Sequence, residues 1–311
     1  MPLVSVVIPL YNKERYITKT IHSVLSQSLQ DLQIIVVDDG STDQSAMLAR
    51  TIGDHRVRVV TQENAGVEIA RNTGLKASDS RFIVFLDADD VIYPQCLEQQ
   101  SRRLEGDSAL VAVATWAHQI DAKGRVIGRL RCPHTDRDIR YQMCFSNPFV
   151  NSSVMTLRSV IESIDGYDAT RGPRFAEDYD LWLRLSTRGS LAAVPRYLTA
   201  YRLLNESRSQ SSLTRLQNSA NLLSCDYLSR IYGLQDEPLL QELIAVLNSA
   251  EDARKRKFTY QDLSQHLNAV QGSLKQSINP NSLRLHKQRI ELFARCFLFR
   301  RIERVDTDSP Q

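Results

Sequence analysis

A run of five apolar residues that ends in three closely spaced carboxylates constrains this chain more than any other stretch. It spans Phe82 to Asp90 and reads FIVFLDADD. An apolar run rich in aromatic and β-branched residues predicts a strand buried on both faces of a sheet. Asp87, Asp89 and Asp90 then emerge at its carboxyl end, which is the edge where open α/β sheets bind ligands. Three such acids repel one another unless a cation lies among them, and their hard oxygen ligands suit Mg²⁺ or Mn²⁺. The alternative is a strand followed by an Asp-rich turn.

Three strand–helix units precede this stretch. Residues 4–8, 34–37 and 57–60 are short apolar runs. Each is followed by polar residues and then by a segment that we predict to be helical. Asn12 is expected to cap the first helix, and residues 41–43 the second. Alternating strands and helices with short joins predict a parallel, right-handed α/β sheet.

The pattern loosens after Asp90. We expect a helix from Pro94, strands over residues 110–115, 153–157 and 191–201, and an edge strand over 124–130. Residues 131–149 are polar and mixed, which predicts a loop. Residues 177–188 predict a helix closed by Gly189. From about residue 212 only helical spacing remains, so we divide the chain into an α/β domain over residues 1–210 and a helical region over 211–311.

Composition excludes several classes of protein. The 311 residues carry a net charge of +3, which is too mild to indicate a nucleic-acid partner. The five cysteines are scattered and contain no C-x-x-C pair, which is typical of a reducing compartment. The sequence shows no signal peptide and no apolar run of membrane-spanning length, so we expect a cytoplasmic protein or one attached to the inner face of a membrane.

Two further acidic clusters could carry chemistry. Asp38 and Asp39 end the second predicted strand, where a carboxylate can accept a hydrogen bond from a nucleobase or a ribose. They could equally form a turn that caps the next helix. Glu177 and Asp178 open a predicted helix, where the helix dipole alone favours acids. An acid placed there beside a metal site could also take a proton from a hydroxyl.

Together these segments resemble the family 2 glycosyltransferases with the GT-A fold. The resemblance covers residues 4–209 and rests on five pieces in order: VSVVIPLYN, IIVVDDGSTD, NAGVEIARNTGL, FIVFLDADD and EDYDLWLRL. It implies a Rossmann-like, mostly parallel sheet flanked by helices. It also implies an inverting transfer of sugar from a nucleotide-sugar donor, most often a UDP-sugar. The acceptor would be a hydroxyl of a glycan or a lipid-linked glycan, in the synthesis of surface polysaccharide.

The resemblance also implies roles for individual residues. Pro9 and Tyr11 would line the nucleotide pocket, Asp39 would accept from the base, and Arg71 would lie near the diphosphate or sugar. Asp87 would contact the ribose or sugar, and Asp89 would bind the Mn²⁺ or Mg²⁺ that bridges the phosphates. Glu177 and Asp178 match the family's ED pair, with Asp178 as the catalytic base.

One departure bears on the metal. The family often carries a Tyr-Arg-x-His segment after the ED helix, whereas this chain has Leu204 at the His position. A third protein ligand to the metal is therefore in doubt, and a catalytically inactive scaffold or partner subunit remains an alternative. Asp87 and Asp89 also match the motif of haloacid-dehalogenase-type phosphatases, although that motif normally opens its domain.

The stretch 285–305 interleaves apolar residues with arginines and lysines. It is either a helix that packs on the protein or a basic amphipathic helix that lies on an anionic membrane. Trp116 and Trp182 are expected to pack in the protein rather than to bind sugar.

Overall fold

The computed structural model describes residues 1–144, 146–169, 176–204, 218–224 and 226–227. The chain divides into two units, one of residues 1–142 and 147–216 and the other of residues 143–146 and 217–311. Residues 218–224 of the second unit are helical. The predicted domain boundary at residue 210, the later helices and the stretch 285–305 lie outside the described residues.

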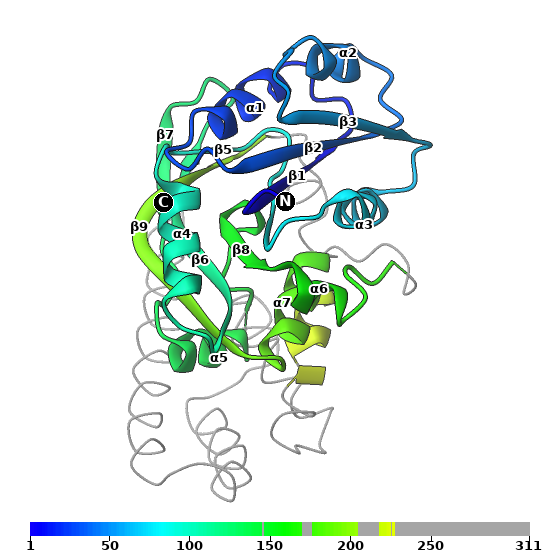
Figure 1. The fold of residues 1–311 in the computed structure, drawn as a ribbon. Helices are drawn as coiled ribbons and strands as arrows, with labels where there is room; N and C mark the ends of the chain where they lie inside the picture. Colours follow the sequence, from blue (N-terminus) through cyan, green and yellow to red (C-terminus); the bar gives the residue numbers. More distant parts are fainter. Residues whose placement is uncertain (145, 170–175, 205–217, 225, 228–311) are drawn as a thin grey trace, which may run out of the picture. The chain divides into compact units, whose positions relative to one another are not determined.

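The first unit is built on one sheet. Its strands are β1 Val4–Leu10, β2 Leu32–Asp39, β3 Val57–Gln62, β4 Phe82–Phe85, β5 Val91–Ile92, β6 Leu110–Ile120, β7 Val126–Leu130, β8 Val154–Leu157 and β9 Ser190–Arg202. They lie in the order β3-β2-β1-β4-β8-β6-β9-β5, and β7 pairs with β6 (Figure 1).

The sheet changes character at its centre. The strands β3, β2, β1 and β4 are all parallel, which confirms the prediction for the N-terminal half. From β4 onward antiparallel pairs enter, because β8 runs against both β4 and β6, and β5 runs against β9. The fold is thus α/β as expected, with a mixed second half.

Helices cover both faces of the parallel half. These helices are α1 Ile17–Leu25, α2 Ser45–Arg50 and α3 Val67–Ala77. The remaining helices are α4 Cys96–Glu105, α5 Asp136–Met143, α6 Arg158–Glu162 and α7 Glu177–Ser186, of which α4 and α7 contact β6 and α6 contacts β8. In Figure 1, α1 and α2 lie above β2 and β3, and α3 lies below them. Val6 and Ile8 pack in one core with Ile17 of α1. Val7 faces α3, where a Cβ added to Gly74 would lie 2.2 Å from Val7 Cγ1.

Three local predictions are wrong. The segment predicted as a loop contains α5, which buries Ile139 and Met143 four residues apart on one face. Gly189 does not close α7 in a left-handed conformation, since α7 ends at Ser186 and Gly189 is absent from the positive-φ residues. Instead Gly189 allows close packing, because an added Cβ would lie 2.4 Å from Val111 Cγ1. Asn12 does not cap α1, which begins at Ile17.

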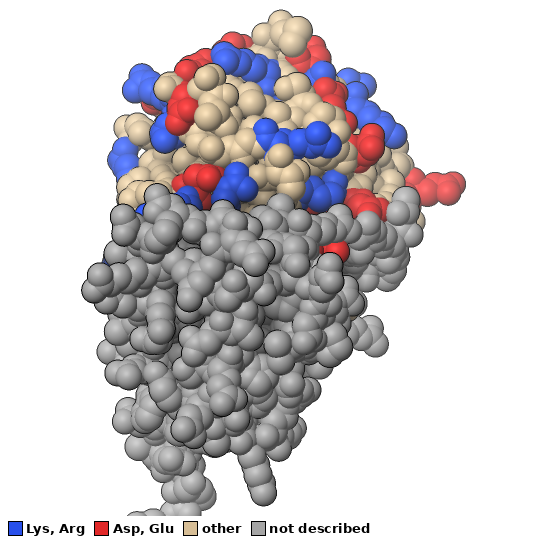
Figure 2. Space-filling view, turned by 90° about the horizontal axis from the view of Figure 1, so that it is seen from below, with Lys and Arg blue, Asp and Glu red and all other residues tan. Residues whose placement is uncertain are grey.

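Basic and acidic side chains are interspersed with uncharged ones on the described face shown in Figure 2. This matches the near balance of 39 Lys and Arg against 36 Asp and Glu in the sequence. None of the helices in the described part of the chain is long and apolar enough to cross a membrane.

Candidate active site

The carboxyl ends of β1, β2 and β4 meet at one edge of the sheet, because these strands are parallel neighbours. The topology therefore brings Tyr11, Asp39 and Asp87 to the same edge, as the sequence predicts. Tyr11 is 47% exposed, whereas Asp39 is 4% exposed. Pro9 lies beside Val37 in the β1–β2 register and is half-buried.

The loop after β1 is held against the loop after β2. Asn12 adopts a positive φ of 50°, and its Oδ1 accepts a hydrogen bond from Thr42 N at 2.8 Å. Lys13 N donates to Ser45 Oγ at 2.7 Å. Residues 41–45 therefore support the loop that carries Tyr11 and Lys13 in addition to starting α2.

Three N–H groups already donate hydrogen bonds to the Asp39 carboxylate. Its Oδ1 accepts from Gln62 Nε2 at 2.8 Å and from Ala65 N at 2.9 Å, and its Oδ2 accepts from Gly66 N at 3.0 Å. An ionised carboxylate offers about four acceptor positions, so about one remains for a ligand. The same contacts fix the turn that starts α3.

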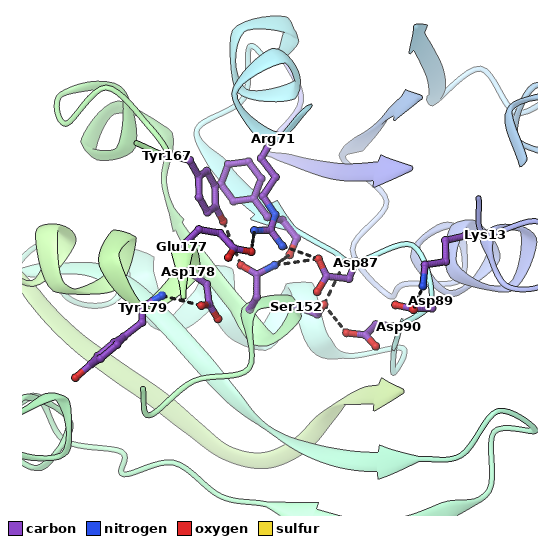
Figure 3. A network of polar contacts seen from close by, with 12 residues as sticks. Lys13, Arg71, Asp87, Asp89, Asp90, Ser152, Tyr167, Glu177, Asp178 and Tyr179 are labelled. Carbon is purple, nitrogen blue, oxygen red and sulfur yellow. Dashed lines mark hydrogen bonds and ion pairs between the residues drawn. The ribbon is translucent and has the colours of Figure 1, made fainter. Parts of the chain in front are cut away.

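The three acids after β4 point to three different partners (Figure 3). Asp87 Oδ1 accepts from Arg71 Nη2 at 2.8 Å. Asp89 Oδ2 lies 2.6 Å from Lys13 Nζ. Asp90 is fully buried, where its Oδ2 accepts from Ser152 Oγ at 2.6 Å and its Oδ1 from Arg202 N at 2.8 Å. Asp90 is thus a buried acid at the end of the turn after β4, where its N donates to Asp87 O at 3.0 Å, and its carboxyl group bonds to β9.

Burial raises the pKa of Asp90 well above its usual range, and the charges of Asp89 and Asp87 add to this effect. A neutral carboxyl group at this position reduces the repulsion among the three acids, because a buried charge is costly unless it is paired.

Arg71 connects the acids after β4 to the acids at the start of α7. Its side chain is 4% exposed, with Nη1 3.1 Å from Glu177 Oε1 and Nη2 2.8 Å from Asp87 Oδ1. The Tyr167 ring lies 5.0 Å from the guanidinium carbon. Burial alone would lower the pKa of Arg71, but Tyr167 and the two carboxylates raise it above its usual value. The guanidinium therefore stays charged and forms an ion pair with each of the two acids.

Asp178 lies in the first turn of α7 and is half-buried. Its Oδ2 accepts from Asn147 Nδ2 at 3.0 Å, and its Oδ1 accepts from Tyr179 N at 2.8 Å. Desolvation raises the pKa of Asp178 to about 7; Glu177 adds to the rise, and Arg71 opposes it. A carboxyl group with this pKa can exchange a proton near neutral pH.

Few side chains in this region could act as ligands to a metal ion. No group of three His, Cys, Asp or Glu side chains that could hold a metal ion occurs within the described ranges of the chain. Asp87 and Asp89 nevertheless fit Mg²⁺ or Mn²⁺, because such ions are often bound by one or two carboxylates together with substrate phosphates and water. Lys13 already pairs with Asp89 through its positive charge.

Sequence reasoning missed several residues of this network. Lys13, Asn147, Asn151, Ser152 and Tyr167 all contact predicted site residues. Lys13 could have been predicted from the sequence, since it is a basic residue in the loop after the first strand. The others come from distant segments whose pairing has no sequence signature. Trp182 is buried, as expected of a packing residue.

The family model described as Glycosyl transferase family 2 matches residues 5–164. The chain therefore belongs to glycosyl transferase family 2. An uncharacterized glycosyltransferase of Haemophilus influenzae is 31% identical over 213 residues, which cover 65% of this chain and 66% of that protein. The matched stretch covers only 43% and 33% of two uncharacterized glycosyltransferases of Rickettsia.

Two solved structures share the fold. S. aureus TarS 1–349, in complex with UDP-GlcNAc, matches with a TM-score of 0.62 and 18% identity over 88% of this chain and 81% of that chain. The mannosyltransferase PcManGT of Pyrobaculum calidifontis, in complex with GDP-Man and Mn²⁺, matches with a TM-score of 0.56 and 16% identity over 94% of this chain and 80% of that chain. At these identities the likeness establishes the GT-A fold expected from the sequence.

Proposed function

We propose that this chain transfers a sugar from a nucleotide-sugar donor, a UDP-sugar, to a hydroxyl of a glycan or lipid-linked acceptor, with inversion at the anomeric carbon. The observation that carries the proposal is the Asp87–Arg71–Glu177 bridge, which connects the acids after β4 to the helix turn that holds Asp178. Family membership supports the reaction class, and the two structural neighbours are complexes with nucleotide sugars.

Asp178 is the proposed general base. With a pKa of about 7 it has a substantial ionised fraction at neutral pH, and it is basic enough to accept the proton of an attacking hydroxyl. Asn147 and the backbone N–H of Tyr179 each hold one oxygen of the carboxylate, so its orientation is fixed before an acceptor arrives. Direct displacement by the acceptor oxygen inverts the anomeric configuration and requires no enzyme nucleophile.

The donor pocket is proposed at the edge formed by β1, β2 and β4. Tyr11 would stack on the base, Pro9 would line the pocket, and the remaining acceptor position of Asp39 would bind the imide N–H of uracil. Asp87 would contact the ribose or the sugar. Arg71 is neutralised by two carboxylates, so we assign it the task of orienting Asp87 and Glu177 next to the donor sugar.

Asp89 is the proposed holder of Mn²⁺ or Mg²⁺. When bound, such an ion stabilises the charge that develops on the leaving diphosphate without needing a proton. With the ion bound at Asp89, the ammonium group of Lys13 would no longer pair with this carboxylate and would contact the phosphates. Leu204 cannot act as a ligand, so phosphate oxygens and water would complete the coordination.

Substitution of Asp178 by Asn tests the proposed base. The change keeps the shape of the side chain and an acceptor oxygen, so the donor should bind as before. Transfer should fall about 10²–10⁴-fold, because that is the usual contribution of a general base. Transfer is measured with a panel of nucleotide sugars and glycan acceptors, and donor binding by calorimetry. Asp107→Asn, at an exposed turn before β6, is the control and should transfer normally. Transfer at the wild-type rate in Asp178→Asn would show that another group is the base.

A catalytically inactive scaffold is the second candidate, and the observation that favours it is Leu204 at the usual His position. A scaffold would bind no nucleotide sugar in the same calorimetric panel. Binding of any nucleotide sugar in that panel would therefore count against this second candidate.

A further inference from the structure

A cluster of aromatic and basic side chains lies on the strands β6, β7 and β9 and on the residues that directly follow β5 and β7, apart from the network around Arg71. We call it the aromatic–arginine patch. It consists of Tyr93, Trp116, His118, Arg129, Arg131 and Tyr197. None of these residues has a role in the proposed reaction.

Tyr197 is the centre of the patch. Its ring stacks on His118 with centroids 4.5 Å apart and planes 5° apart, and it lies 5.3 Å from the Trp116 ring. Tyr93 Oη lies 3.0 Å from His118 Nδ1 and locks the imidazole in place. The four rings therefore form a rigid support, because each one is held by a neighbour.

Two exposed arginines lie on this support. Arg131 places its guanidinium carbon 4.9 Å from the Trp116 ring centroid, and its Nε donates to Tyr197 Oη at 2.7 Å. Arg129 lies 5.9 Å from the Tyr197 centroid. Cation–π contact holds a guanidinium flat on a ring and leaves N–H groups at its edge for a ligand.

Among the described residues, these two arginines have no acidic partner. No carboxylate lies within ion-pair distance of Arg129 or Arg131 in the part of the chain that the structure describes. On the same hairpin, Arg125 is paired with Asp121 at 2.7 Å. Two guanidinium groups on aromatic rings, with no acidic partner in the described ranges, are complementary to a carboxylate or a phosphate. Arg131 is already held by its hydrogen bond and ring contact, so it has little side-chain entropy left to lose on binding.

The patch and the proposed active site share the strand β9. Five residues along the strand separate Tyr197 from Arg202, and Arg202 Nε donates to the carbonyl oxygen of Asp89 at 2.7 Å. This stretch spans about 17 Å at roughly 3.3 Å per residue. A chain of several sugar units is long enough to cover that distance, whereas a free phosphate ion is not.

We propose that the aromatic–arginine patch binds an anionic group, a carboxylate or a phosphate, of the acceptor glycan at a position several sugar units from the hydroxyl that reacts. This inference rests on the proposed function, because it assumes that a glycan is the acceptor. It adds that the acceptor is an anionic polymer and that it is held away from the reacting end.

Tryptophan fluorescence provides a direct test, because the sequence has two tryptophans and Trp182 is 1% exposed. The full chain is titrated with hyaluronan oligosaccharides, which carry regularly spaced carboxylates, and with neutral dextran of matched length. Hyaluronan should change the emission of Trp116, dextran should not, and binding should weaken as salt is added. The signal should disappear in Trp116→Phe.

The double variant Arg129→Gln and Arg131→Gln should bind hyaluronan at least roughly tenfold more weakly, since each charge-assisted hydrogen bond contributes about a factor of ten or more. The matched control is Arg102→Gln with Arg103→Gln on α4, which removes the same charge elsewhere and should bind normally. Equal binding by the two double variants would overturn the proposal, as would equal binding of dextran.

A parallel titration with vesicles separates a glycan from a lipid source of the anion. Binding to phosphatidylglycerol vesicles but not to hyaluronan would assign the patch to a membrane surface and refute the proposal. These measurements need neither donor nor metal, and they do not depend on transfer. Failure of the glycan site and failure of the proposed catalysis are therefore distinguishable.

Discussion

At the scale of single residues, the acids after β4 differ in state although they are adjacent in sequence. Asp87 and Asp89 are each paired with a cation, and Asp90 is buried among neutral partners with a raised pKa. Their environments come from three different elements, which supply Arg71, Lys13 and Ser152. The local sequence DADD therefore contains one acid that we assign to the fold and two that we assign to ligands.

The buried role of Asp90 can be tested by comparing two substitutions. Asp90→Asn keeps an acceptor for Arg202 N, and the Ser152 hydroxyl can rotate to accept from the new amide, so the free energy of unfolding should change by less than about 1 kcal/mol. Asp90→Ala leaves both partners unsatisfied and should lose about 2–4 kcal/mol. Urea denaturation measures both. A loss of equal size in the two variants would show that Asp90 is needed as a charge.

The pH dependence of transfer should report Asp178. A general base works in its ionised form, which predominates above its pKa, so the rate should rise with pH through about 7. Glu177→Gln removes the negative charge that helps to raise this pKa and frees Arg71 to stabilise the Asp178 carboxylate. The rising limb should then move to lower pH in the rate profile of kcat. A limb that stays in place would mean that a different group titrates.

At the scale of elements, the position of Arg71 depends on how closely α3 approaches the sheet. Gly74 lies one turn after Arg71, and it allows α3 to rest directly on Val7 of β1. The helix axis, and with it the guanidinium that joins Asp87 to Glu177, is set by this contact. A small residue far from the ligand thereby controls a charged group in the site.

Gly74→Ala distinguishes helix propensity from packing. Propensity alone predicts a gain of about 0.5–1 kcal/mol for alanine in a helix. An alanine Cβ would lie 2.2 Å from Val7 Cγ1, so we expect a loss of about 1–3 kcal/mol and a slower transfer rate. The control is Gly106→Ala at the end of α4, where an added Cβ lies 3.3 Å from Arg102 O and the backbone is already helical. A stabilised Gly74→Ala protein would refute this packing role.

At the scale of the whole molecule, ligand binding should couple to folding. The proposed donor and metal groups come from the ends of β1, β2 and β4 and from the start of α7, which are far apart along the chain. Only the folded unit presents them together. A ligand that binds the folded state alone raises the free energy of unfolding by about 2.7 kcal/mol at a concentration of 100 Kd.

A UDP-sugar with Mn²⁺ should therefore raise Tm by roughly 5–10 °C, given the usual 2–4 °C per kcal/mol for a chain of this size. The UDP-sugar without Mn²⁺ should give a smaller shift. Asp89→Ala should abolish the part that depends on Mn²⁺, whereas Asp107→Ala should retain it. Thermal melts with UDP-, GDP-, dTDP- and CDP-sugars identify the nucleotide. Identical shifts with and without Mn²⁺ would remove the metal from the proposed function.

The sequence by itself determined the parallel half of the sheet and the edge at which the acids gather. Apolar runs in the sequence predict buried strands, and neighbouring parallel strands must end at a common edge of the sheet. The ordered motifs were enough to indicate the family before any coordinates. Ile139 and Met143 are four residues apart, a spacing that is typical of the helix α5. Pro133 and Pro148 lie nearby and favoured the prediction of a loop.

Only the tertiary structure decided which acid meets which partner. Arg71 is 106 residues from Glu177, and Lys13 is 76 residues from Asp89. Such pairings depend on the packing of α3 and α7 and on the loop after β1. No periodic pattern in the sequence predicts them. The antiparallel strands and the aromatic–arginine patch arise in the same way, because residues from β6, β7 and β9 become neighbours only when the sheet forms. The sequence determines which functional groups are present and which elements carry them. The electrostatic environment of each group and its long-range contacts are properties of the folded protein.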